Sequence, residues 1–111
     1  MTYKQISTLV SSIGLPYAYY QFPNDTPQTP PFICFFFDES DDLAADNINY
    51  QLIRHIFLEL YTSEKDFATE ATVETALKGA EIFYNRSEQY LDSERLYMVV
   101  YEFEVVVTEE N

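Results

Sequence analysis

The segment Leu96 to Thr108, LYMVVYEFEVVVT, constrains the fold more than any other part of the chain. Its odd-numbered residues are all apolar or aromatic, whereas the even-numbered set includes Glu102, Glu104 and Thr108. A period of two over this length predicts a β-strand that packs one face on a core and turns the other toward solvent. Such a strand needs antiparallel neighbours and a second layer over its apolar face, so the segment predicts a layered sheet protein.

Two amphipathic segments predict the helices of that second layer. In residues 2–13, apolar residues from Ile6 to Ile13 recur at the i, i+3, i+4, i+7 spacing of one helix face, with Thr2 as the expected N-cap. Gly14 and the following Pro16 are expected to end this helix.

The second helix is expected over residues 66–78, closed near Gly79. Its predicted inner face carries Phe67, Ala71 and Leu77, flanked by Val73 and Ala76. Glu70 and Glu74 are expected on the solvent face, with Glu74 placed to pair with Lys78.

The remaining apolar runs predict strands over residues 17–22, 32–37, 48–62 and 81–85, the last resuming at 88–91. Proline-rich residues 23–31 separate the first two strands as a stiff, extended loop. The element order is therefore α-β-β-β-α-β-β, with a turn over residues 92–95. We expect one α+β domain, 1–111, in which a mainly antiparallel sheet of four to five strands carries both helices on one face.

The charge of the chain excludes several classes of partner. Nineteen acidic residues against six Lys and Arg give a formal net charge of −13. Tight binding to nucleic acid needs Lys and Arg to displace counterions, so it is not expected. No run of about 18 apolar residues predicts a membrane span. The single Cys34 excludes an internal disulfide, and the first residues lack the apolar core of a signal peptide, so we expect a soluble, cytosolic chain.

Residues with catalytic or metal-binding chemistry are few. Cys34 and the lone His55 are the candidate nucleophile pair, but Cys34 lies within FICFFF, where a buried inert thiol is the ordinary outcome. The segment FFFDESDD, Phe35 to Asp42, runs from three phenylalanines into four acids. An EF-hand loop needs Gly at its sixth position, but in a loop that begins at Asp38 the sixth residue is Leu43, so the pattern fails. The alternatives are a looser divalent site from Asp38, Asp41, Asp42 and Asp46, or a solvated loop. We therefore expect no enzyme, cofactor or metal.

Several stretches together resemble a family of small proteins encoded in the tail-assembly block of long-tailed phages and prophages of Gram-positive bacteria. These stretches are the opening helix with IGLPYAYYQF, then PPF, the loop ending ADN, the strand INYQLIRHIFLELYT, and SEQYLDSERLYMVVYEFEV. The resemblance spans nearly the whole chain. It is to tail-terminator proteins, also described as tail-completion or head–tail joining proteins.

The resemblance implies a non-enzymatic virion protein that forms a hexameric ring on the finished tail tube. Such a ring stops tube polymerisation and offers a surface to the head connector. The implied partners are further copies of the chain, the tail tube protein and the head-completion protein. The implied location is the tail of the virion, assembled in the cytoplasm of the bacterial host. A monomer in free solution that forms rings only on the tube end is the alternative.

A ring through which DNA passes should not hold phosphates, so its lumen or rim is expected to be acidic. Screening over about 8–10 Å would confine this repulsion to the lumen. The predicted lumen or rim residues are Asp38, Glu39, Asp41 and Asp42, and then Glu102 and Glu104. The predicted subunit or tube contacts are Tyr17, Tyr19, Tyr20, Tyr84 and Tyr90, for which ordinary core packing is the competing explanation.

Two other functions are compatible with the sequence. A head-completion or stopper-type joining protein would use the opposite face of a similar ring. An inhibitor that mimics DNA would use the acidic residues as substitutes for phosphates, although here many of them cluster in one loop.

Overall fold

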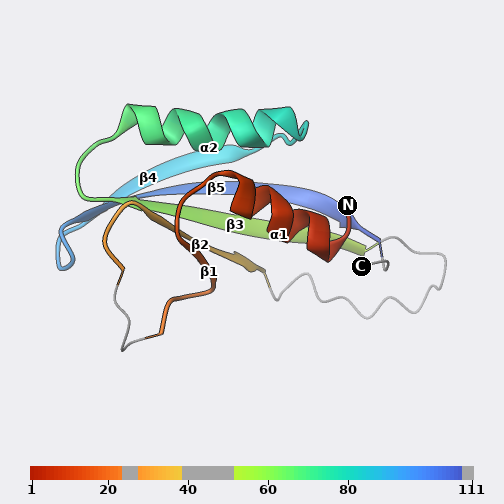
Figure 1. Cartoon of the computed structure of the whole chain (residues 1–111), viewed down its shortest axis with the longest axis horizontal. Helices are drawn as coiled ribbons and strands as arrows, with labels where there is room; N and C mark the ends of the chain where they lie inside the picture. Colours follow the sequence, from red (N-terminus) through yellow and green to blue (C-terminus); the bar gives the residue numbers. More distant parts are fainter. Residues whose placement is uncertain (24–27, 39–51, 109–111) are drawn as a thin grey trace.

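A five-stranded sheet in the order β1-β2-β3-β5-β4 is the frame of the molecule (Figure 1). The computed structural model describes residues 1–23, 28–38 and 52–108. The elements are α1 (Tyr3–Ser12), β1 (Tyr17–Tyr19), β2 (Phe32–Phe37), β3 (Leu52–Thr62), α2 (Phe67–Gly79), β4 (Asn85–Leu91) and β5 (Leu96–Val107). β1 runs parallel to β2, and the pairs β2–β3, β3–β5 and β4–β5 are antiparallel. The α+β class and the element order are therefore confirmed.

Both helices cover the same face of this sheet. Ile6 and Val10 of α1 and Val73 and Leu77 of α2 are at most 2% exposed and belong to one buried cluster. Their partners are alternate residues of the three inner strands. These are Ile33 and Phe35 of β2, Ile56, Leu58 and Leu60 of β3, and Val99, Tyr101, Phe103, Val105 and Val107 of β5. The period-two prediction for the last strand is confirmed, since its odd-numbered residues from Val99 onward are buried.

The first helix begins where its sequence predicts. The backbone N–H of Gln5 donates to the Thr2 hydroxyl at 3.0 Å, and the Thr2 N–H donates to the Gln5 side chain at 2.8 Å. This reciprocal capping box satisfies two amides that the first turn would otherwise leave without partners. The N-terminal ammonium of Met1 also donates to the Val106 carbonyl at 2.9 Å, which ties the start of the chain to β5.

Two strand boundaries differ from those expected. β1 ends at Tyr19 rather than at residue 22, because Tyr20 adopts a positive φ of 75°, which is incompatible with an extended strand. β4 begins at Asn85 rather than at 81, because the Glu81 and Ile82 amides still bond to the Lys78 and Leu77 carbonyls at the end of α2. For β3, expected over 48–62, residues 48–51 lie outside the described residues.

The second helix is rotated relative to its expected orientation. Phe67 is 72% exposed and Ala71 is exposed, so neither belongs to the inner face. Glu70, expected in solvent, is instead 3% exposed. Residues 70, 73 and 77 form the buried stripe of the helix. Glu70 can be buried there because it bonds to Lys65 and Arg86 beneath the helix.

Truncation of Leu58 to alanine tests the position of the core. Leu58 is fully buried at the centre of β3, so Leu58→Ala should lower the free energy of unfolding by about 2–5 kcal/mol. Ile53 lies on the same strand with the opposite parity and is 49% exposed, so Ile53→Ala should cost much less. Urea denaturation followed by circular dichroism measures both. Equal losses would contradict the assignment of faces.

Candidate functional site

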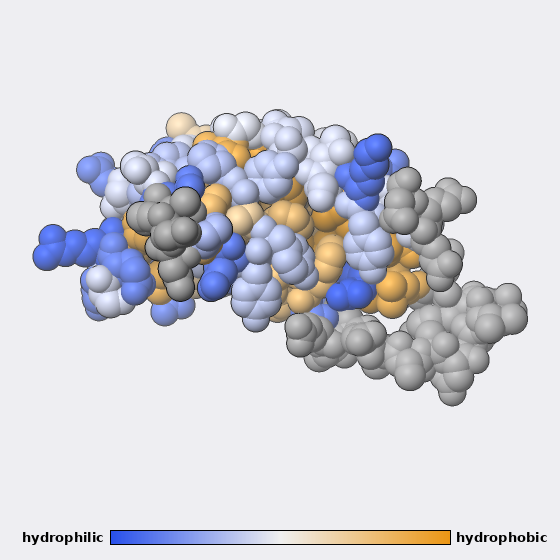
Figure 2. Space-filling model, turned by 60° about the horizontal axis from the view of Figure 1, so that its bottom comes forward, coloured by the Kyte–Doolittle hydropathy of each residue, from blue (hydrophilic) through white to orange (hydrophobic). Residues whose placement is uncertain are grey.

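The face of the sheet opposite the helices carries aromatic, histidine and glutamate side chains that are not part of the core. We call it the open face, and the strand register identifies its residues. They are Phe32, Cys34 and Phe36 of β2, Ile53, His55, Phe57, Glu59 and Tyr61 of β3, and Met98, Val100, Glu102, Glu104 and Val106 of β5. Both described helices lie on the other side. Figure 2 turns the lower side of Figure 1, where β1 and β2 lie, toward the viewer and shows hydrophobic residues exposed among polar ones.

Aromatic rings cover the β2–β3 half of the open face. Phe36 stacks on Phe57 with centroids 5.2 Å apart, and His55 stacks on Phe57 at 5.3 Å. Tyr20 packs against Phe36 from the edge of the sheet at 5.2 Å. Nearer the other end of the strands, Phe32 stacks on Tyr61 at 4.9 Å. These side chains are partly buried by one another, and they leave an apolar surface of fixed shape.

Carboxylates define the β5 half of the same face. Glu102 and Glu104 share it, as the alternation predicts, and Glu102 Oε2 lies 2.8 Å from His55 Nε2. Glu59 accepts a 2.7 Å hydrogen bond from the Tyr61 hydroxyl. Burial and this bond raise the pKa of Tyr61, so its hydroxyl stays protonated. The open face therefore combines an aromatic half with an acidic half.

The acidic segment after β2 is described only at its first residue. Asp38 directly follows β2, and its backbone N–H donates to the His55 carbonyl at 2.8 Å. Glu39, Asp41, Asp42 and Asp46 lie outside the described residues. Within 1–23, 28–38 and 52–108, no three His, Cys, Asp or Glu side chains gather as a metal site would require.

The predicted contact tyrosines divide between opposite edges of the sheet. Tyr17, Tyr19 and Tyr20 lie at the β1 edge and are 40%, 50% and 59% exposed. Tyr90, on β4 at the other edge, is 44% exposed. Tyr84, just before β4, is half-buried and packs edge-on against Tyr101 at 5.3 Å, so core packing accounts for it.

Sequence reasoning missed a cluster of charges between α2 and β4. Glu70 accepts hydrogen bonds from Lys65 Nζ at 2.7 Å and from Arg86 Nη2 at 2.5 Å. Lys65 also bonds Glu88 of β4 at 2.6 Å, and Glu74 accepts from the Tyr101 hydroxyl at 2.9 Å. A buried carboxylate is stable only with such partners, and here they fix α2 to the edge strand. The signal was present in the sequence, since Glu70 shares the i, i+3, i+7 spacing of Val73 and Leu77.

The cluster shifts the titration of its members. Hydrogen bonds to Glu70 and Glu88 raise the pKa of Lys65, and the bond to Lys65 lowers the pKa of Glu88. Burial opposes the charge of Arg86, but its bond to Glu70 prevails and raises its pKa. The contribution of Glu88 to stability is therefore present above its ordinary pKa and is lost as pH falls through its lowered one.

The structure does not bring Cys34 and His55 together. Cys34 pairs with Glu59 across the β2–β3 ladder. His55 lies four residues before Glu59 on β3, which places it about 13 Å from Cys34 along the strand. Cys34 instead lines a hollow of about 440 Å³ beside β1, together with Tyr20, Phe22, Phe32 and Glu59. Glu59 is the charged neighbour of this buried thiol, and its negative charge disfavours the thiolate instead of activating it.

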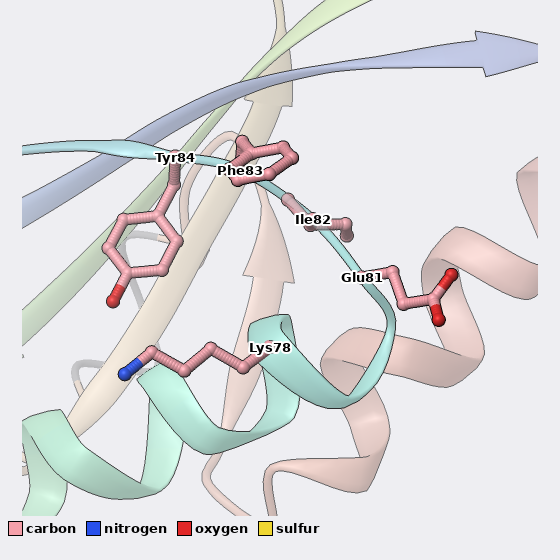
Figure 3. Close-up of a pocket in the computed structure, with 5 residues that line it drawn as sticks. All are labelled: Lys78, Glu81, Ile82, Phe83 and Tyr84. Atoms are coloured by element: carbon pink, nitrogen blue, oxygen red, sulfur yellow. The ribbon is translucent and has the colours of Figure 1, made fainter.

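A second hollow, of about 580 Å³, lies where α2 leads into β4 and is lined by Lys78 and residues 81–84 (Figure 3). Phe83 in this loop is 96% exposed. Figure 3 shows Tyr84 turned toward α2 and Phe83 on the other side of the chain. Phe83 therefore adds almost nothing to the core of its own chain.

No family model, curated protein or solved structure matches this chain. Among the described residues, no helix is long and apolar enough to cross a membrane.

The reactivity of Cys34 tests the environment of the open face. Burial, and then the charge of Glu59, raise the pKa of the thiol to about 11. At pH 8 its thiolate fraction should be about two orders of magnitude below that of an ordinary cysteine. Iodoacetamide labelling followed by mass spectrometry should therefore be slow in the folded chain, fast in urea, and faster in Glu59→Gln than in the unchanged chain. Equal rates in the folded and unfolded chains would contradict this environment.

Proposed function

We propose that the chain is a non-enzymatic assembly protein of a long-tailed phage or prophage, a tail terminator that forms a ring on the tail tube. The ring caps the tube, stops its polymerisation and joins the head connector. The observation that supports an assembly role is the open face, an apolar and acidic sheet surface held rigid by helices on its other side. The resemblance in sequence supports the narrower assignment to the tail.

The aromatic half of the open face has the composition of a protein contact. Contacts between proteins are enriched in Tyr and Phe, and their rigid rings lose little entropy on binding. Tyr20, Phe36 and Phe57 form such a row, with Tyr20 59% exposed at its end. We assign this half to the tail tube protein.

The tyrosines at the two edges support head-to-tail contact between copies. A ring forms when each subunit joins the next through two different surfaces and the rotation closes. The β1 edge offers Tyr17 and Tyr19, and the β4 edge offers Tyr90. These edges face opposite directions in one sheet, as a ring of side-by-side sheets requires.

The acidic half is our candidate for the lumen. Glu102 and Glu104 lie on a central strand, and Asp38 follows the neighbouring β2. Repeated around a ring, the two glutamates of β5 would form a negative band that repels DNA passing through it.

Growth of the tail tube tests the assignment. Added at a substoichiometric ratio, the chain should stop polymerisation of the purified tail tube protein of the same phage, as measured by electron microscopy of tube lengths. Tyr20→Ala should require a concentration roughly five- to thirtyfold higher, because an aromatic contact of about 1–2 kcal/mol is lost. Phe67→Ala removes an exposed ring from α2, on the far side of the sheet, and should act like the unchanged chain.

Other results would replace the assignment. A chain that binds finished tails without halting tube growth is a head-joining protein. A chain that ignores tube protein but competes with DNA for a DNA-binding enzyme is a DNA mimic.

Neutralising the acidic half tests the lumen. Glu102→Gln/Glu104→Gln should leave rings intact but slow the ejection of DNA, because the weakened band no longer repels phosphates. Glu64→Gln/Glu81→Gln removes the same charge from exposed loop positions and is the matched control. Ejection kinetics of virions assembled with each variant provide the measurement. Identical kinetics in the two variants would exclude Glu102 and Glu104 from the lumen.

A further inference from the structure

The outer strand β4 and the residues just before it have a sequence that is nearly symmetric about Ser87. From residue 83 to 91 it is FYNRSEQYL, in which each residue has a matching or complementary counterpart at the same distance on the other side of the serine. We propose that β4 pairs antiparallel with β4 of a second copy of this chain, about a two-fold axis at Ser87. This contact goes beyond the proposed function and does not depend on it.

β4 has the exposure that such pairing requires. It is the last strand of the sheet and bonds only to β5, so its outer backbone groups have no strand partner among the described residues. Asn85 to Tyr90 are all exposed. An exposed edge of this length is a template for pairing with another chain.

A two-fold axis at Ser87 places complementary residues opposite each other. Arg86 lies across from Glu88 of the second copy, and Asn85 lies across from its Gln89. Tyr84 likewise faces the partner's Tyr90. The two residues of each pair are both odd-numbered or both even-numbered, so their side chains lie on the same face of the combined sheet. Directly opposed side chains on one face contact each other.

The neighbouring registers are unfavourable. An axis at Arg86 would place the two Arg86 side chains opposite each other, and an axis at Glu88 would oppose the two glutamates. Like charges directly across a strand pair are destabilising, whereas opposite charges stabilise it. The charges of β4 therefore favour the register centred on Ser87 over both of its neighbours, while the symmetry of the flanking residues, Asn85 with Gln89 and Tyr84 with Tyr90, selects the same axis.

Ion pairs within the chain already hold Arg86 and Glu88 in place before the contact forms. Arg86 is held by Glu70 and Glu88 by Lys65, so both are ordered before a partner arrives. Preorganisation of this kind reduces the entropy lost on binding. Both copies would contribute Arg86 and Glu88, giving four alternating charges around the axis.

The same axis accounts for the exposure of Phe83. At 96% exposed, this ring packs on little of its own chain. In the proposed pair it lies across from the partner's half-buried Leu91, on the open-face side, opposite the side that Tyr84 occupies in Figure 3. Two such contacts, one at each end of the strand pair, would add apolar burial to the backbone hydrogen bonds.

The contact is isologous and closes at two copies, so it does not itself build a ring. A dimer of this kind occupies the β4 edge. The head-to-tail contacts proposed above use the same edge through Tyr90, so the dimer must open before a ring closes, and rings would form only where another contact competes with the dimer.

Single cysteines measure the register directly. Opposed Cα atoms in an antiparallel pair are about 4.5–5.5 Å apart, within the range that a disulfide spans. Ser87→Cys should therefore crosslink rapidly to itself under mild oxidation. Asn85→Cys and Gln89→Cys should each crosslink poorly alone but efficiently when mixed. The unchanged chain, which retains Cys34, is the blank, and Ser93→Cys in the exposed turn is the matched control.

Sedimentation equilibrium provides a second measurement without new thiols. The unchanged chain should be a dimer at micromolar concentrations, and Glu88→Arg should raise its dissociation constant at least tenfold. Glu94→Arg makes the same charge change in the turn and should leave the constant unchanged. A chain that is monomeric at all concentrations overturns the proposal. So does a dimer in which Ser87→Cys crosslinks no faster than Ser93→Cys, because its contact then lies elsewhere.

Discussion

The antiparallel ladder between β3 and β5 is the interaction on which the rest of the structure depends. It runs unbroken from Leu52 opposite Val107 to Thr62 opposite Tyr97, and a slip by one residue would move the buried side chains of a strand to the other face. One face of the ladder is aliphatic and aromatic and receives both helices. The other combines rings with glutamates, which a core would not accept without partners. The division into a buried and an open face thus follows from the pairing of two strands.

The sequence was sufficient for this division because period-two patterns report burial directly. The alternation of β5 and the capping residue Thr2 both predicted what the structure has. Features that depend on distant residues were not predictable in the same way. Glu70 appeared to belong in solvent because its partner Arg86 lies on another element, and β1 ends early because Tyr20 adopts a positive φ. The role of the acidic residues after Asp38 stays a prediction.

Three of the six basic residues are placed where they organise structure. Lys65 and Arg86 hold α2 on β4 through Glu70, and Arg54 lies under α1, with its guanidinium 4.8 Å from the ring centre of Phe37 and 3.4 Å from the Tyr3 hydroxyl. A chain with a net charge of −13 could have used these cations on its surface. With these three used beneath the helices, the other three, Lys4, Lys78 and Arg95, are exposed, and exposed acids such as Glu104 outnumber them among the described residues.

The edges of the sheet present a different requirement from its faces. β1 is short and parallel, and a three-residue edge offers little backbone for pairing. β4 is longer and is exposed from Asn85 to Tyr90, and its charges would ordinarily serve to prevent association. Their order along the strand changes that expectation, because the two neighbouring registers, centred on Arg86 and Glu88, oppose like charges, whereas the register centred on Ser87 places Arg86 across from Glu88. Selectivity in this edge thus arises from the arrangement of two charges that the fold already holds in place through Glu70 and Lys65. In the proposed pair, the same two charges that make the neighbouring registers repulsive set the register of the contact.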